Sequence, residues 1–161
     1  MTLDPNSAVI ACLALLAFIA LIDGVGVHLV RERLHRRPES RTEHLLHTGR
    51  AFLFPPILFF FFGGAGFSLG IVFLALDQVL EVADMAIERR SRAYSGGLRT
   101  SEYLLHGTAL TLRGAAIAFS VAAATPSPAV VSFVELLLPG AILGAILHVV
   151  LMVPFRRGLS A

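Results

Sequence analysis

The stretch AVIACLALLAFIALIDGVGVHLVR, residues 8–31, decides the fold class. Asp23 is its only carboxylate, and no basic residue precedes Arg31. At a rise of about 1.5 Å per residue, a helix of this length crosses the roughly 30 Å hydrocarbon core of a bilayer. An Arg-rich stop-transfer pattern follows it, and no basic residue precedes it, so we expect a retained spanning helix rather than a cleaved signal peptide.

Four more apolar stretches follow the first and use up most of the chain. The expected spans are residues 8–31, 43–62, 66–88, 102–124 and 129–154. The 161 residues are 56% hydrophobic, with a mean hydropathy of +0.78, which is far above that of a water-soluble domain. We therefore predict an all-α integral membrane protein with five transmembrane helices, forming a single domain over residues 1–161.

The basic residues predict how the chain is oriented. All 13 are Arg, and eleven of them gather in residues 31–41, in residues 89–99 and after the last span. The positive-inside rule then predicts an external N-terminus and a cytoplasmic C-terminus in the inner cell membrane. The uncharged connections 63–66 and 125–128 fit short external hairpins. Because these Arg residues flank apolar segments, the pI near 9.3 does not indicate a nucleic-acid partner.

A short motif occurs twice and predicts an internal repeat. RTEHLLH at residues 41–47 matches RTSEYLLH at residues 99–106, with one residue inserted. Asp23 and Asp84 each lie in the cytoplasmic half of the preceding span. We therefore expect helices one and two to recur as helices three and four around a polar bundle core, with helix five added.

The third stretch carries carboxylates at the spacing of one helix face. They are Asp77, Glu81, Asp84 and Glu88, at intervals of four, three and four residues. Asp77 falls near the bilayer centre, where an isolated charge costs about 2.5–3.5 kcal/mol on insertion scales. The stripe therefore has to face protein or water, and something has to neutralise it.

The neighbouring stretches offer groups at matching depths. Arg113 lies at about the depth of Asp77, so we expect these two residues to pair. Arg50 is then expected to be the only fixed cation left in the polar layer, which keeps a surplus of negative charge. The predicted ion-pair and supporting residues are Asp23, Arg50, Asp77, Glu81 and Arg113.

In helical bundles, transition metals such as iron or zinc are bound by carboxylate and imidazole ligands that converge from several helices. The predicted metal ligands are Glu43, His47, Asp84, Glu88, Glu102 and His106. In the repeated Glu-x-x-x-His element, the spacing of four places both donors on one helix face. As a motif this resembles the ferritin-like di-iron carboxylate proteins, although these use Glu-x-x-His, and no family is assigned.

Simpler roles exist for several of these residues. Glu43 and Glu102 also suit the first turn of a helix without any metal, and the acidic stripe also suits a ladder of interhelical ion pairs. His28, His35 and His44 lie among arginines near the interface, so we expect them to be solvated. Glu135 and His148 lie on different faces of the fifth span, and we assign them no role.

Four functions fit this pattern. The leading hypothesis is a metal-dependent membrane enzyme, an oxidoreductase or hydrolase that acts on a lipid-soluble substrate. The alternatives are a proton or cation transporter, a b-type haem protein with His47 and His106 as axial ligands, and a structural subunit of a homo- or hetero-oligomer.

Overall fold

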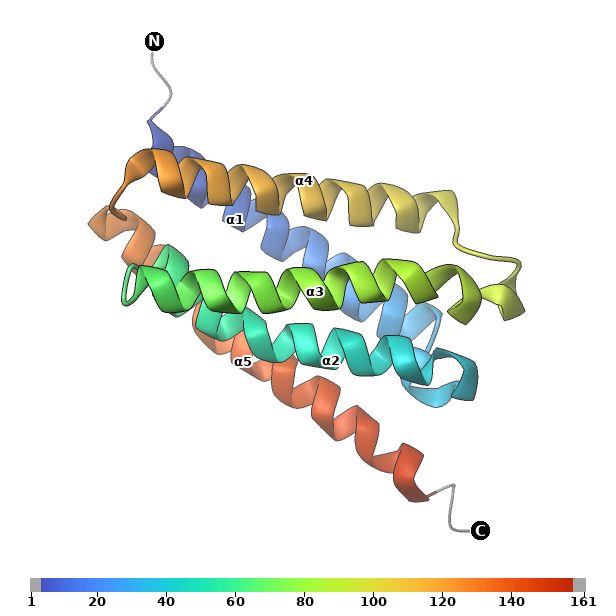
Figure 1. Ribbon diagram of the computed structural model, residues 1–161. Helices are drawn as coiled ribbons and strands as arrows, with labels where there is room; N and C mark the ends of the chain where they lie inside the picture. The colour runs from blue at the N-terminus through green and yellow to red at the C-terminus, as the bar shows by residue number, and fades with distance from the viewer. Residues whose placement is uncertain (1–3, 158–161) are drawn as a thin grey trace.

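The computed structural model describes residues 4–157, which form five long helices joined by short connections (Figure 1). The helical segments are α1 (Pro5–Ala20) continued by η1 (Leu21–Arg31), α2 (Arg41–Pro56) continued by η4 (Ile57–Phe62), α3 (Phe67–Ser91), α4 (Thr100–Ala123) and α5 (Pro128–Arg157). These residues contain no strand, which confirms the all-α class. Three short 3₁₀ turns lie in the connections: η2 (Leu34–Arg36), η3 (Pro38–Ser40) and η5 (Ala93–Ser95).

The first helix begins with a local capping arrangement. The carboxylate of Asp4 accepts a hydrogen bond from the backbone N–H of Ser7 at 2.9 Å, which satisfies a donor in the first turn. Pro5 follows at the first helical position, where its missing N–H costs nothing. The start of α1 is therefore fixed by its own sequence.

Two of the long helices end in π-helical segments, in which backbone hydrogen bonds reach back five residues. At the end of η1, the backbone N–H of Glu32 donates to the carbonyl of Val27 at 2.8 Å. The five-residue repeat brings Asp23 and His28 onto the same face. In the second helix, the π-helical segment follows Pro55–Pro56, which have no N–H to donate to carbonyls four residues earlier.

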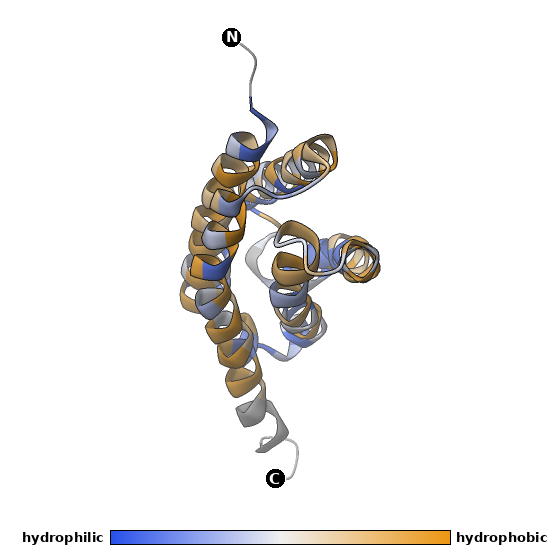
Figure 2. Ribbon diagram, turned by 90° about the vertical axis from the view of Figure 1, so that its left-hand side faces the viewer, coloured by the Kyte–Doolittle hydropathy of each residue, from blue (hydrophilic) through white to orange (hydrophobic). Residues whose placement is uncertain are grey.

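The helices form a bundle in which α1 packs along α4, while α2 lies between α3 and α5 (Figures 1 and 2). The backbone of α4 stays apart from that of α3 over most of their length (Figure 1). Both Arg-rich connections, residues 32–40 and 92–99, lie at one end of the bundle, and the other two connections lie at the opposite end. The internal repeat and the orientation in the membrane stay predictions.

The apolar core occupies the end of the bundle away from the Arg-rich connections. Its buried members come from four of the long helices: Val9, Leu13, Ile57, Leu58, Phe61, Phe62, Ala116, Val130 and Val134. Gly70 permits a close approach here, because a Cβ atom at this position would lie 2.7 Å from the Cα of Phe61. This packing leaves the other half of the bundle interior to polar side chains.

Many large apolar side chains are exposed along the long helices, whose residues are largely hydrophobic (Figure 2), as expected of a protein in lipid. Four helical segments are long and apolar enough to cross a membrane: residues 5–36, 38–62, 100–123 and 128–152. The prediction of five such helices therefore holds for four. The third, α3, is not among them because of the carboxylates along its length.

Candidate metal centre

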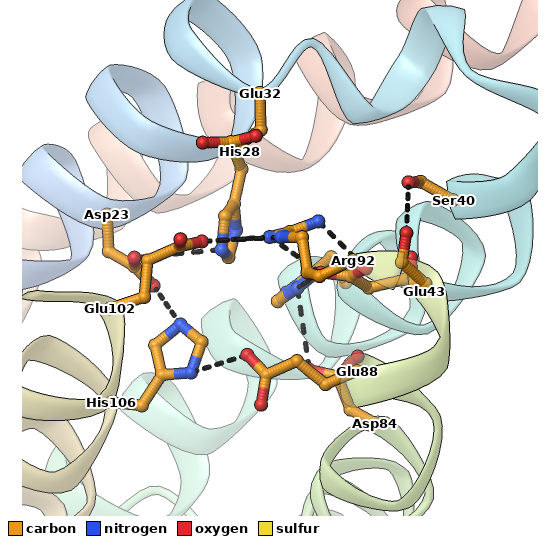
Figure 3. Close-up of polar contacts among 12 residues, drawn as sticks. Asp23, His28, Glu32, Ser40, Glu43, Asp84, Glu88, Arg92, Glu102 and His106 are labelled. Carbon is orange, nitrogen blue, oxygen red and sulfur yellow. Dashed lines mark hydrogen bonds and ion pairs between the residues drawn. The ribbon is translucent and has the colours of Figure 1, made fainter. Parts of the chain in front are cut away.

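The polar side chains gather inside the half of the bundle near the Arg-rich connections (Figure 3). The buried polar residues of this layer are His28, Glu32, Ser40, Glu43, His44, Asp84, Glu88, Ser91, Arg92 and Glu102. They come from η1, α2, α3, α4 and the connections between them. Buried ionisable groups are costly unless they are paired or bind a metal, so their partners decide what the layer can do.

His28 lies at the middle of this layer. Only 2% of its surface is exposed, and its ring centroid lies 4.4 Å from that of His47 and 5.6 Å from that of His106. The expectation that His28 is solvated near the interface is therefore wrong. The π-helical turn of η1 is the physical reason, because it rotates residue 28 inward, onto the face that carries Asp23.

Two groups of donor atoms share this imidazole. One consists of Asp23, His28 and His106, and the other consists of His28, Glu43 and His47. Within each group, the donor atoms lie within 4.8 Å of one another, so each group could hold a metal ion. Nε2 of His28 and Nε2 of His47 are both buried and make no hydrogen bond among the described residues, as expected of atoms placed to bind an ion.

His106 is held between two carboxylates (Figure 3). Its Nε2 lies 3.1 Å from Oδ2 of Asp23, and its Nδ1 lies 2.8 Å from Oε1 of Glu88. A neutral imidazole can donate through Nδ1 to Glu88 and keep Nε2 free as a metal ligand, which is the common arrangement around metal-binding histidines. Glu88 is thus placed to orient the ring.

His47 has a comparable environment on the other side of His28. Its Nε2 lies 3.4 Å from Oδ2 of Asp84 and 3.8 Å from Oε1 of Glu43. Asp84 and Glu88 come from the same helix, one turn apart, and each contacts a histidine of a different group. The carboxylates of α3 therefore line the side of the layer opposite η1.

Arg92 enters the same layer from the connection that follows α3. Its side chain is fully buried, with Nη1 2.9 Å from Glu43 and Nη2 3.1 Å from Glu102 (Figure 3). Burial alone would lower the pKa of Arg92, but the Glu43 and Glu102 carboxylates raise it above its ordinary value. The guanidinium therefore stays charged and joins the starts of α2 and α4.

This contact changes the expected charge balance. Arg50 is not the only fixed cation of the layer, because Arg92 lies in it and Arg31 contacts Glu102 at 2.9 Å. Arg50 itself contacts Asp77 and Glu81, deeper in the bundle. Asp23, Asp84 and Glu88 contact imidazoles and have no guanidinium within ion-pair distance in the described chain, so negative charge still surrounds the histidines.

A second network lies deeper in the bundle, around the first two carboxylates of α3. Arg50 contacts Asp77 at 3.0 Å and Glu81 at 3.2 Å, and Arg113 contacts the same two carboxylates and Gln78. Two guanidiniums and two carboxylates balance in charge. These contacts link α2, α3 and α4 where the backbones of α3 and α4 are apart.

The two Arg-rich connections are tied together over the polar layer. The hydroxyl of Tyr94 donates to Glu32 at 3.2 Å, and the guanidinium of Arg37 lies 4.1 Å above the Tyr94 ring. Burial and the nearby Glu32 carboxylate raise the pKa of Tyr94, so the hydroxyl keeps the proton that it donates. Ser40 also donates to the carbonyl of Ser91 at 3.3 Å. These contacts cover the layer at that end.

The remaining histidines lie next to the layer. His44 is 2% exposed and stacks on His148 with ring centroids 5.4 Å apart, while His35 lies 6.2 Å from His44. The expectation that His44 is solvated is therefore wrong, because α5 covers its face of α2. His148, to which we assigned no role from its position in the fifth span, supplies that contact.

The structure distributes the six predicted ligands over three environments. Glu43, His47 and His106 belong to the two donor groups. Asp84 and Glu88 lie against the imidazoles from outside the groups. Glu102 is bound by Arg92 and Arg31. Their role in binding a metal stays a prediction.

Sequence reasoning missed His28 and Arg92. For His28, the signal of irregular helical geometry was the pair of glycines, Gly24 and Gly26, in a span that also carries a carboxylate. For Arg92 the signal was the need for a cation near Glu43 and Glu102, the two first-turn acids. Comparisons with protein-family models, with curated proteins and with solved structures found no match.

Proposed function

We propose that this chain is a multi-pass membrane metalloprotein that binds transition-metal ions in the His28 layer and uses them as a metal-dependent enzyme. The observation that carries the proposal is that buried His28, whose Nε2 makes no hydrogen bond among the described residues, is shared by two groups of metal-type donors. Imidazole with carboxylate favours iron or zinc over magnesium or calcium. Such an ion would supply Lewis-acid or redox chemistry inside the bundle.

The proposal includes α3 as a fifth spanning helix. Its carboxylates point into the bundle, where they are buried, and its outward face carries exposed apolar side chains such as Leu76, Val79, Val82 and Met85. A helix whose charges are satisfied inside a bundle can lie in lipid although its mean composition is polar. The location that follows is the inner cell membrane, with the Arg-rich end in the cytoplasm.

A lipid-soluble substrate is the class that suits this site. Arg92, Tyr94 and Glu32 lie across the bundle end above the layer and are held there by hydrogen bonds, which favours approach from the lipid over approach from that end. Helices α3 and α4 contact each other through side chains, among them Glu88 with His106 and Asp77 with Arg113. A lipid-soluble molecule would reach the layer laterally, between these helices.

Metal analysis and an absorption spectrum of the purified protein test the proposal. We expect a stoichiometric transition metal in protein prepared without chelator. His47→Ala and His106→Ala should each remove part of it, whereas His148→Ala, which lies outside both groups, should leave the metal content unchanged. Iron would favour an oxidoreductase, and zinc a hydrolase. Metal-free wild-type protein would end the proposal.

A proton or cation path is the second candidate. Buried carboxylates follow α3 from Asp77 in its middle, through Asp84 and Glu88, towards the Arg-rich end. Ion and proton paths are built from such acids inside membranes. pH-dependent flux in liposomes by protein that holds no metal would favour this function. The haem alternative has less support, because His28 contacts both His47 and His106 and occupies the space that a porphyrin between them would need.

A further inference from the structure

A pocket of about 180 Å³ lies where the first helix meets the Arg-rich connection. It is lined by Leu29, Val30, Arg33, His35 and Arg36, so basic side chains face it and no carboxylate does. This pocket is separate from the metal layer.

The two arginines of the pocket have no carboxylate within ion-pair distance in the described chain. Their neighbours differ, because Arg31 pairs with Glu32 and Glu102, and Arg37 lies on the Tyr94 ring. Unpaired guanidiniums that share a pocket are suited to a phosphate group, which their planar forks bind through several hydrogen bonds.

His35 also lines the pocket. Its Nε2 accepts a hydrogen bond from Nε of Arg36 at 3.2 Å, so the neutral ring carries its hydrogen on Nδ1. That Nδ1 is buried and has no hydrogen-bond partner among the described residues. An unmade bond of this kind is unusual in a folded protein and calls for an acceptor.

The backbone at the pocket has a conformation that residues other than glycine rarely adopt. Arg33 has φ 53° and ψ 47°, in the left-handed region, which costs a non-glycine residue free energy. Leu34, fully buried, anchors the next position. The turn places Arg33 and Arg36 on the same pocket, which an extended connection would not do.

The position of the pocket indicates a lipid as the source of the phosphate. It lies at the end of a helix long and apolar enough to span a membrane, and the apolar side chain of Val30, which lines it, is 64% exposed. Phosphate groups of lipids lie at this depth. We propose that Arg33, His35 and Arg36 bind the phosphate of an anionic phospholipid. With no carboxylate in the pocket, nothing pairs with the ammonium of a zwitterionic headgroup.

Lipid titration of the full-length protein tests this site. Delipidated protein in detergent is titrated with phosphatidylglycerol, phosphatidylcholine or sodium phosphate, and bound lipid is counted by native mass spectrometry. We expect wild-type protein to prefer phosphatidylglycerol. The double variant Arg33→Gln/Arg36→Gln should weaken that binding by about 10-fold or more.

The control is Arg89→Gln/Arg90→Gln, which removes the same charge from exposed positions at the same end of the bundle. It should change the affinity by less than about twofold. Equal losses in both double variants would show general attraction of charge and overturn the site. Equal binding of phosphatidylglycerol and phosphatidylcholine by wild-type protein would also overturn the site. Binding of phosphate from sodium phosphate alone would assign the pocket to a free anion. Metal content, measured on the same samples, reports separately on the metal centre.

Discussion

Arg92 and Glu43, far apart in the sequence, form a fully buried ion pair in which Nη1 of the guanidinium lies 2.9 Å from the carboxylate. The same guanidinium also contacts Glu102, so one side chain joins the first turns of α2 and α4. Without it, Glu43 would lose its guanidinium partner and Glu102 would keep only Arg31.

Arg92→Gln should therefore destabilise the protein strongly. Breaking a buried ion pair by removing one partner costs about 3–5 kcal/mol, because the other charge stays buried. Thermal unfolding of the detergent-purified protein measures the effect, and the exposed Arg89→Gln serves as the control. Unfolding temperatures that match between the two variants would contradict this role for Arg92.

The network around Asp77 predicts coupling between two helices. Arg113→Leu should reduce the folded yield markedly, because Asp77 and Glu81 lose one of their two cations. Asp77→Asn in the same background should restore part of the yield by removing a charge that has become surplus. The recovery is expected to be partial because Glu81 remains. Losses that simply add in the double variant would argue against the coupling.

Close helix packing at the apolar end makes a further prediction. Gly70→Ala would place a Cβ atom 2.7 Å from the Phe61 backbone, which cannot move aside as a flexible side chain could. We expect a loss of about 1–3 kcal/mol in the free energy of unfolding. Gly107→Ala is the matched control, since a Cβ there meets nothing within 4 Å. Equal stability of the two variants would mean that η4 and α3 pack less closely than described.

Orientation can be tested with single cysteines placed in a Cys12→Ser background. If the Arg-rich end is cytoplasmic, an impermeant maleimide added to intact cells should label Ala65→Cys and not Arg36→Cys. Permeabilised cells should show labelling at both positions, which controls for reactivity. The reverse pattern in intact cells would invert the proposed topology.

Much of the fold follows from local pattern. Apolar length and Arg-flanked ends mark the helices, and the spacing of acids on α3 marks its inward face. His28 was not predictable in this way, because its direction depends on the π-helical turns of η1 rather than on α-helical periodicity. Arg92 was not predictable because its burial depends on how the connection after α3 folds back. His44 required knowledge of where α5 lies, which only tertiary packing decides.

His28 is the ligand that the two proposed metal positions share. The most direct test is the metal content per chain of wild-type protein, His28→Leu, His47→Ala and His106→Ala, all purified without chelator and checked for folding. We predict that His28→Leu loses metal from both positions, whereas His47→Ala and His106→Ala each keep the position that does not contain the altered residue. A wild-type protein without stoichiometric metal, or a His28→Leu variant that keeps the full wild-type content, would contradict the account.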